Sequence, residues 1–171
     1  MKKKQEILHT ARLTLKAFEP CDKPQMMEIF YNKEIKKTYM LPDFDSPAQA
    51  EALFQKMMNI SRAEDLFEYG IYLDHRLIGF INDCEIKGNA IELGYVIAPA
   101  YQGQGFATEA LGICIQELFA IGFEQVKAGF FEGNIASCRV MQKCGMHKID
   151  FEEDIEYRGI LRHCIYYAIE K

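Results

Sequence analysis

The amino-acid sequence predicts a mixed α/β (α+β) sandwich, in which roughly four helices cover a central sheet of about seven strands. Stretches of alternating apolar and polar residues lie on both sides of a long amphipathic stretch. That stretch is flanked by two strand-like segments, as in a right-handed βαβ unit with parallel strands. The chain has 171 residues, of which 49% are hydrophobic, and this suits one domain over residues 1–171 with its own core.

The first half of the chain predicts a strand, two helices and a hairpin. Leu13 and Leu15 alternate with polar residues, as in a strand with one buried face. Ser46 and Pro47 suit the N-cap and the first position of a helix. The expected elements are a strand within residues 8–18, helices over 23–37 and 46–61, and hairpin strands over 67–73 and 77–84.

The second half contains the clearest helix, over residues 106–121. Its apolar residues form one stripe, and Gly122 follows where a C-terminal glycine is expected. Strands over 90–97 and 125–131 flank this helix. The remaining expected elements are a helix over 134–145 and strands over 146–151 and 161–169.

Composition and charge disfavour several classes of function. The formal net charge of -5 argues against a nucleic-acid-binding surface, which needs clustered Lys and Arg. No apolar run approaches the length of a membrane span, and the basic start of the chain lacks the apolar stretch of a signal peptide. The acidic balance suits a cationic partner such as an amine, and it equally suits plain solubility.

Cysteine and histidine spacing predicts no metal site. The six cysteines form no Cys-x-x-Cys pair, and the four histidines are spread along the chain. We expect the cysteines to be reduced thiols in the cytoplasm. The sequence has no internal repeat or flexible linker, and it leaves a monomer and a homodimer equally open.

A glycine-containing loop before the clearest helix is the most informative segment. The first turn of a helix leaves main-chain N–H groups unpaired and carries partial positive charge. Because Gly103 and Gly105 have no side chains, a pyrophosphate could approach those groups closely. A glycine turn that only starts the helix is the alternative. The candidate phosphate-binding residues are Gln102, Gly103, Gln104, Gly105, Phe106, Ala107 and Thr108.

Two common nucleotide-binding patterns fit this loop poorly. A P-loop requires Lys after its last glycine, but here Phe106 follows Gly105. A dinucleotide-binding loop requires a third Gly or Ala where this chain has Thr108. Too little sequence then remains for a second nucleotide-binding half. The loop therefore predicts another phosphate-containing ligand.

The loop resembles the hallmark of the GCN5-related N-acetyltransferases, the GNAT superfamily. Residues 102–107 fit its pattern Gln/Arg-x-x-Gly-x-Gly/Ala in full. Residues 10–16, 92–97, 134–137 and 143–146 resemble segments of the ribosomal-protein N-acetyltransferase (RimJ/RimL-type) branch. These segments follow the expected order over nearly the whole chain, which makes the resemblance specific.

The resemblance implies a mixed sheet whose fourth and fifth strands, here residues 90–97 and 125–131, splay apart. Acetyl-CoA would enter the gap as acyl donor, with its pantetheine arm near Val96 and Ile97. Its pyrophosphate would lie on the N–H groups of residues 102–108, and no metal is implied. The acetyl group would pass directly, in a ternary complex, to a primary amine of a small molecule or of a protein N-terminus.

The resemblance also implies roles for three side chains. Glu92 would handle the amine, although it could also be an ordinary polar strand residue. Asn134 would contact the cofactor as well as cap its helix. Many family members carry a Tyr four residues after Ser137 to protonate the thiolate, but this chain has Met141. We therefore expect Ser137 or water to act as the acid.

The acceptor side carries no motif that identifies the amine. Its pocket would be built from residues 37–50 and 150–159. An acidic cluster in the second segment is either a solvated turn or a negative lip that attracts a cationic amine. Met141 leaves open an alternative function, an inactive acyl-CoA-binding sensor or interaction module. The acidic cluster comprises Glu152, Glu153, Asp154 and Glu156.

Overall fold

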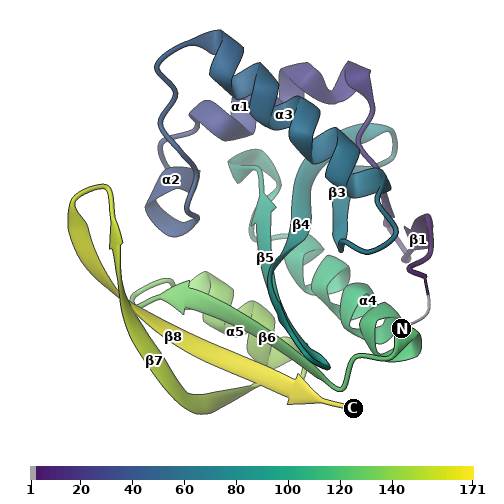
Figure 1. Ribbon diagram of the computed structural model, residues 1–171, viewed down its shortest axis with the longest axis vertical. Coiled ribbons are helices and arrows are strands. Elements are labelled where there is room, and N and C mark those ends of the chain that lie inside the picture. Colours follow the sequence, from purple (N-terminus) through teal and green to yellow (C-terminus); the bar gives the residue numbers. More distant parts are fainter. Residues whose placement is uncertain (1–2) are drawn as a thin grey trace.

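A mixed sheet of eight strands runs through the molecule in the order β1-β2-β3-β4-β5-β6-β8-β7 (Figure 1). The computed structural model describes residues 3–171. Neighbouring strands pair antiparallel, with the exception of the parallel pair β5–β6. The strands are β1 (Ile7–His9), β2 (Leu13–Lys16), β3 (Glu68–Leu73), β4 (Arg76–Lys87), β5 (Ala90–Ile97), β6 (Gln125–Phe131), β7 (His147–Tyr157) and β8 (Ile160–Glu170).

Helices cover both faces of the sheet. Leu111 and Leu118 of α4 are fully buried in one apolar cluster, while Phe30 of α1 and Phe54 of α3 lie in a second cluster on the other face. None of the helices described in residues 3–171 is long and apolar enough to cross a bilayer. The helices are α1 (Lys23–Tyr31), α2 (Ile35–Thr38), α3 (Pro47–Arg62), α4 (Phe106–Ile121) and α5 (Ile135–Lys143), with short 3-10 turns at Pro20–Asp22 and Pro99–Tyr101.

The N-terminal segment differs from the prediction of one strand within residues 8–18. It forms two short antiparallel strands, β1 and β2, which raises the strand number to eight. The turn between them is held by Thr10, whose N–H donates to Leu13 O at 2.9 Å. The main-chain N–H of Arg12 also donates to Glu109 Oε1 of α4 at 2.9 Å. This distant partner explains why local alternation did not predict the break.

The helix predicted over residues 23–37 is divided at Asn32. The Asn32 side-chain oxygen accepts hydrogen bonds from the N–H groups of Glu34 and Ile35, at 2.9 and 3.1 Å. Asn competes well with a helical main chain in this way. The result is the separate short helix α2. Ser46 does occupy the N-cap position of α3, although within residues 3–171 its hydroxyl makes no capping bond.

The sheet opens between β5 and β6, which are the strands predicted to splay. Their parallel pairing runs from Ala90 opposite Gln125 to Glu92 opposite Lys127, and within residues 3–171 it goes no further. β5 continues to Ile97 on its own course beside β4, whereas β6 pairs with β8 over its whole length. Figure 1 shows β5 arching away from β6 above this point. The predicted splay is therefore confirmed.

Candidate active site

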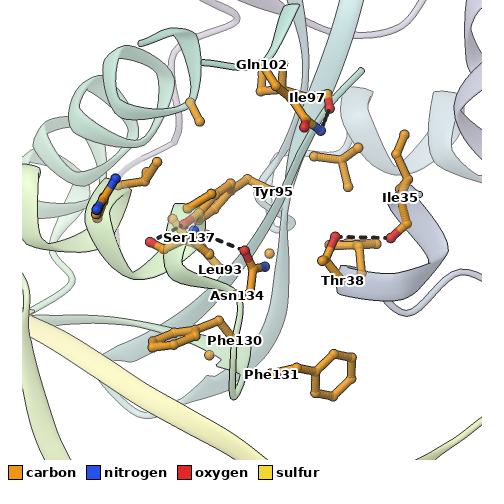
Figure 2. Close-up of a pocket in the computed structure, with 18 of the residues that line it drawn as sticks. Ile35, Thr38, Leu93, Tyr95, Ile97, Gln102, Phe130, Phe131, Asn134 and Ser137 are labelled. Atoms are coloured by element: carbon orange, nitrogen blue, oxygen red, sulfur yellow. Dashed lines mark hydrogen bonds between the residues drawn. The ribbon is translucent and has the colours of Figure 1, made fainter. Parts of the chain in front are cut away.

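A cavity of about 700 Å³ lies where β5 and β6 separate. It is lined by the glycine loop, β5, the start of α5, α2, and the inner face of β6 and β8. All six cysteines of the chain are free thiols, two of which, Cys84 and Cys164, line this cavity. Figure 2 shows Gln102 and Ile97 at one end of the cavity, Tyr95, Ser137 and Asn134 along one wall, and Ile35 and Thr38 across from them.

The glycine loop presents main-chain donors to this cavity. Gly103 and Gly105 have φ angles of 74° and 85°, in the left-handed region that favours glycine. Gly105 is the N-cap of α4, and its carbonyl accepts the N–H of Glu109 at 3.1 Å. The N–H groups of residues 106–108 precede that first bond and so have no partner within the helix. A side chain at Gly103 would meet nothing within 4 Å, so the loop is open to a ligand.

The two glutamines of the loop have structural roles. Gln102 Nε2 donates to the Ile97 carbonyl at 2.8 Å and ties the loop to the end of β5. Gln104 Nε2 donates to the Ala100 carbonyl at 3.2 Å. Of the seven predicted loop residues, only Gln104 does not line the cavity within the described chain. Its side chain points back onto the preceding turn.

The main-chain groups of β5 alternate between β4 and the cavity. The Ala98 N–H donates to Ile78 O of β4 at 2.8 Å. In an antiparallel pair this places the main-chain groups of Ile97 and Tyr95 on the opposite side, toward the opening. Val96 also lines the cavity, but its own main-chain groups face β4. The available main-chain groups are therefore those of Tyr95 and the N–H of Ile97, because the Ile97 carbonyl already accepts Gln102 Nε2.

Arg12 reaches the glycine loop from the β1–β2 turn, and no local motif predicted this contact. Its Nη1 donates to the Gln104 carbonyl at 3.0 Å, and its Nε donates to Glu109 Oε2 at 2.8 Å. The guanidinium also lies over the Phe106 ring, 4.4 Å from the centroid. A side chain added at Gly105 would lie 3.4 Å from Arg12 Nη2. Arg12 thus holds the loop from the side away from the cavity's donors.

Glu92 lines the cavity at the last position where β5 pairs with β6. Burial raises the pKa of its carboxyl group, and nearby Lys127 partly offsets that rise. Lys127 faces Glu92 across the strand pair, and its ammonium lies 4.0 Å from Glu85. A carboxylate with a raised pKa at the base of a cleft is a suitable proton acceptor.

Asn134 and Ser137 lie together at the start of α5. The Asn134 side chain caps the helix by accepting the N–H of Ser137 at 3.2 Å. Ser137 Oγ shares a hydrogen bond of 2.7 Å with the hydroxyl of Tyr95, which the sequence did not single out. Burial raises the pKa of Tyr95, so its phenol stays neutral and can donate. Met141 is fully buried in the apolar cluster beneath α4 and does not face the cavity.

The acidic cluster lies on strand β7, so the prediction of a solvated turn is wrong. Successive side chains on a strand alternate between its faces. Glu152 and Asp154 contact the ring nitrogens of His163, at 3.1 and 2.8 Å. Glu153 points to the other face and accepts the Tyr166 hydroxyl at 2.5 Å. Tyr166 lines the cavity, so Glu153 contacts a residue of the cavity wall.

The two segments expected to form the acceptor pocket do meet. The Tyr157 hydroxyl of β7 donates to the carbonyls of Tyr39 and Leu41, at 3.3 and 3.0 Å. The Arg158 guanidinium lies 2.9 Å from an oxygen of Asp43. Figure 1 shows the tip of the β7–β8 hairpin reaching the region of α2. These contacts join two segments that each contribute to the cavity wall, through Tyr39 and Ile155.

Most of the chain matches one known protein family. The family described as "Acetyltransferase (GNAT) domain" matches residues 12–147. The chain belongs to the GNAT acetyltransferases. Within residues 3–171, no group of three His, Cys, Asp or Glu side chains is placed to hold a metal ion.

Several relatives of this GNAT protein span almost its whole length. The uncharacterized N-acetyltransferase YoaA of Bacillus subtilis (strain 168) is 29% identical over 165 residues, covering 94% of this chain and 88% of YoaA. The ribosomal alpha-N-protein acetyltransferase RimL superimposes with a TM-score of 0.84 at 18% identity, covering 97% of this chain and 94% of RimL. The microcin self-immunity acetyltransferase MccE, solved with acetyl-CoA and AMP, has a TM-score of 0.80 at 16% identity and covers 95% of this chain and 94% of its own. These structures share the fold of this GNAT protein.

Proposed function

We propose that this GNAT protein transfers an acetyl group from acetyl-CoA directly to a primary amine in a ternary complex. The observation that carries the proposal is the set of unpartnered N–H groups at the start of α4, beside the opening between β5 and β6. Such a helix start suits a pyrophosphate. The complexes of MccE with acetyl-CoA and of RimL with coenzyme A support this choice of donor.

Acetyl-CoA would lie along β5 in this proposal. Residues 103–108 would bind its pyrophosphate through their N–H groups. The main-chain groups of Tyr95 and the N–H of Ile97 would pair with the pantetheine arm, and the Asn134 amide would lie close to it. When bound, the cofactor supplies an activated thioester. The protein's contribution is to hold the carbonyl carbon beside the amine.

Glu92 would accept the proton that the amine loses. The raised pKa of Glu92 lies closer to neutral pH, where a general base works best. The need for this base depends on the acceptor, because an α-amine has a pKa of about 8 and a lysine amine about 10.4. A water molecule between Glu92 and the amine would be sufficient for the first.

The Ser137 hydroxyl would donate a proton to the departing sulfur. Tyr95 would hold Ser137 Oγ in position and could resupply its proton through their shared hydrogen bond. The Tyr95–Ser137 pair would supply the proton that Met141 cannot donate. Because the cavity already contains two hydroxyl donors, Met141 gives no reason to favour a catalytically inactive acyl-CoA-binding module.

The proposal is tested by following free thiol release from acetyl-CoA in the presence of a panel of primary amines. Amine-dependent release above the hydrolysis blank, with one acetylated amine formed per thiol, is expected. Calorimetric binding of coenzyme A without release for any amine would contradict transfer. Absence of coenzyme A binding would contradict the site itself.

A further inference from the structure

The acceptor side of the cavity has a shape and charge that point to one class of amine. Resting on the proposed function, we infer that the acceptor is a small primary monoamine with an apolar or aromatic body, and that a polypeptide chain is a poor substrate. Four features carry this inference: a bridge over the acceptor side, aromatic walls, a single unpaired carboxylate and a limited volume.

The bridge joins the β7–β8 hairpin to the segment after α2. Tyr157 is partly buried, and its hydroxyl donates to two main-chain carbonyls of residues 39–41. Arg162 Nη1 donates to the Lys37 carbonyl at 3.2 Å, and Arg158 pairs with Asp43. An open cleft would let a polypeptide lie across the reacting centre. The bridge obstructs that path and leaves access for a slender molecule.

Two tyrosines lie flat on the strands that form the acceptor walls. A Cβ at Gly94 of β5 would lie 3.0 Å from Tyr39 Cε2, and a Cβ at Gly129 of β6 would lie 2.7 Å from Tyr166 Cε1. Glycine therefore lets each ring approach its strand this closely. Phe131, which is 6% exposed, completes an aromatic lining. These walls favour an apolar substrate body.

Charge on the acceptor side matches one ammonium group. Two carboxylates line the described part of the cavity, those of Glu34 and Glu92. Glu34 is already paired with Lys37, whose Nζ lies 2.8 Å from both carboxylate oxygens. Glu92 is left as the partner for a cationic amine. A polyamine would require further carboxylates along the cavity.

The volume also favours a small acceptor. A cavity of about 700 Å³ is within the range that holds one drug-sized ligand. Because the glycine loop and β5 line the same cavity, the pyrophosphate, the pantetheine arm and the acetyl group of acetyl-CoA must share this space. The remaining space therefore suits a small amine.

The inference is tested by comparing kcat/KM for four amines at saturating acetyl-CoA. The probes are hexylamine, 2-phenylethylamine, spermidine and a lysine-free decapeptide with a free N-terminus. The two monoamines are expected to exceed spermidine and the peptide by at least about 10-fold. Equal or better use of the peptide, or of spermidine, would overturn the acceptor class while leaving acetyl transfer intact. Absence of turnover with all four would count against the proposed function as well.

The bridge itself is tested with Tyr157→Phe, which removes the hydroxyl but keeps the ring. The kcat/KM ratio of peptide to 2-phenylethylamine is expected to rise about 5-fold, with coenzyme A affinity unchanged. Tyr31→Phe is the matched control, because Tyr31 is exposed and lies outside the cavity. A ratio that stays constant in Tyr157→Phe would show that the bridge does not select the acceptor.

Discussion

The two halves of the cleft are built in different ways. The cofactor half consists of short contiguous segments, residues 95–108 and the start of α5, and it offers main-chain donors with Arg139 and Lys143 nearby. The acceptor half draws single side chains from α2, β5, β6 and β8, around one unpaired carboxylate, Glu92. Recognition through main-chain groups suits an acyl donor that many enzymes share. Side-chain recognition can change with each acceptor.

The largest effect is expected for Gly105→Glu in the cofactor half. The added side chain would begin 3.4 Å from Arg12 Nη2 and disturb its hold on the loop, its charge would lie beside the phosphate-binding N–H groups, and the φ angle of 85° strains any side chain. We expect coenzyme A affinity to fall by more than about 1,000-fold, or about 4 kcal/mol, in calorimetry. Gly88→Glu is a matched control, since Gly88 has a φ of 59° and lies in the distant β4–β5 turn. Retained affinity in a folded Gly105→Glu protein would refute the phosphate site.

Glu92→Gln should affect the acceptor half alone. Loss of the base is expected to lower kcat/KM for the amine by about 100-fold, with coenzyme A affinity within about 2-fold. Wild-type activity should fall as pH drops through the raised pKa of Glu92, because protonation removes the base. Glu92→Gln should lack this fall in activity at low pH. The difference in kcat/KM between the wild type and Glu92→Gln should narrow at alkaline pH, where the amine is already neutral.

Glu85→Gln is the control for Glu92→Gln. Glu85 carries the same charge nearby, pairs with Lys87 at 2.8 Å, and does not line the described cavity. A pH profile for Glu92→Gln that merely parallels the wild type at lower rate would indicate that Glu92 positions the amine and does not accept its proton.

The same contrast explains which parts could be predicted from sequence. The strands at 90–97 and 125–131 and the helix at 106–121 match their predicted bounds, because periodicity and glycine ends are local signals. The Arg12 contact to the glycine loop could not be predicted, because its partners Gln104 and Glu109 lie far along the chain. Signals from neighbouring residues along the chain thus predict the half of the cleft proposed to bind the cofactor.

The acceptor half shows why a chain-local signal can mislead. Residues 152–156 were predicted as a turn or lip because acidic residues usually mark solvated segments. Their alternation on β7 instead sends Glu153 toward Tyr166 and its neighbours toward His163. The Tyr95–Ser137 hydrogen bond could not be predicted from a local pattern either, since it joins β5 to α5. Such pairings depend on strand register, which a motif does not contain.

The Tyr95–Ser137 pair lies between the two halves and should give intermediate effects. We expect Tyr95→Phe and Ser137→Ala each to lower kcat by about 10-fold, because each impairs donation to the leaving sulfur. Their double variant should lose little more than either alone, as expected for groups that act together. Tyr167→Phe is the control, because Tyr167 contacts Cys138 of the same helix from outside the described cavity. If the two losses in kcat multiplied in the double variant, Tyr95 would act independently of Ser137.

The smallest effect is expected for Arg12, which holds the loop without lining the cavity. Its fork of donors spans the Gln104 carbonyl and Glu109, a geometry that a lysine ammonium cannot reproduce. Arg12→Lys and Arg12→Ala should therefore each weaken coenzyme A binding by about 3-fold, while kcat at saturating acetyl-CoA stays unchanged. Arg76→Lys, at an exposed pair with Glu28, serves as the control. If lysine restored full affinity, positive charge near the pyrophosphate would account for Arg12, and the placement of the loop would depend on its glycines and Gln102 alone.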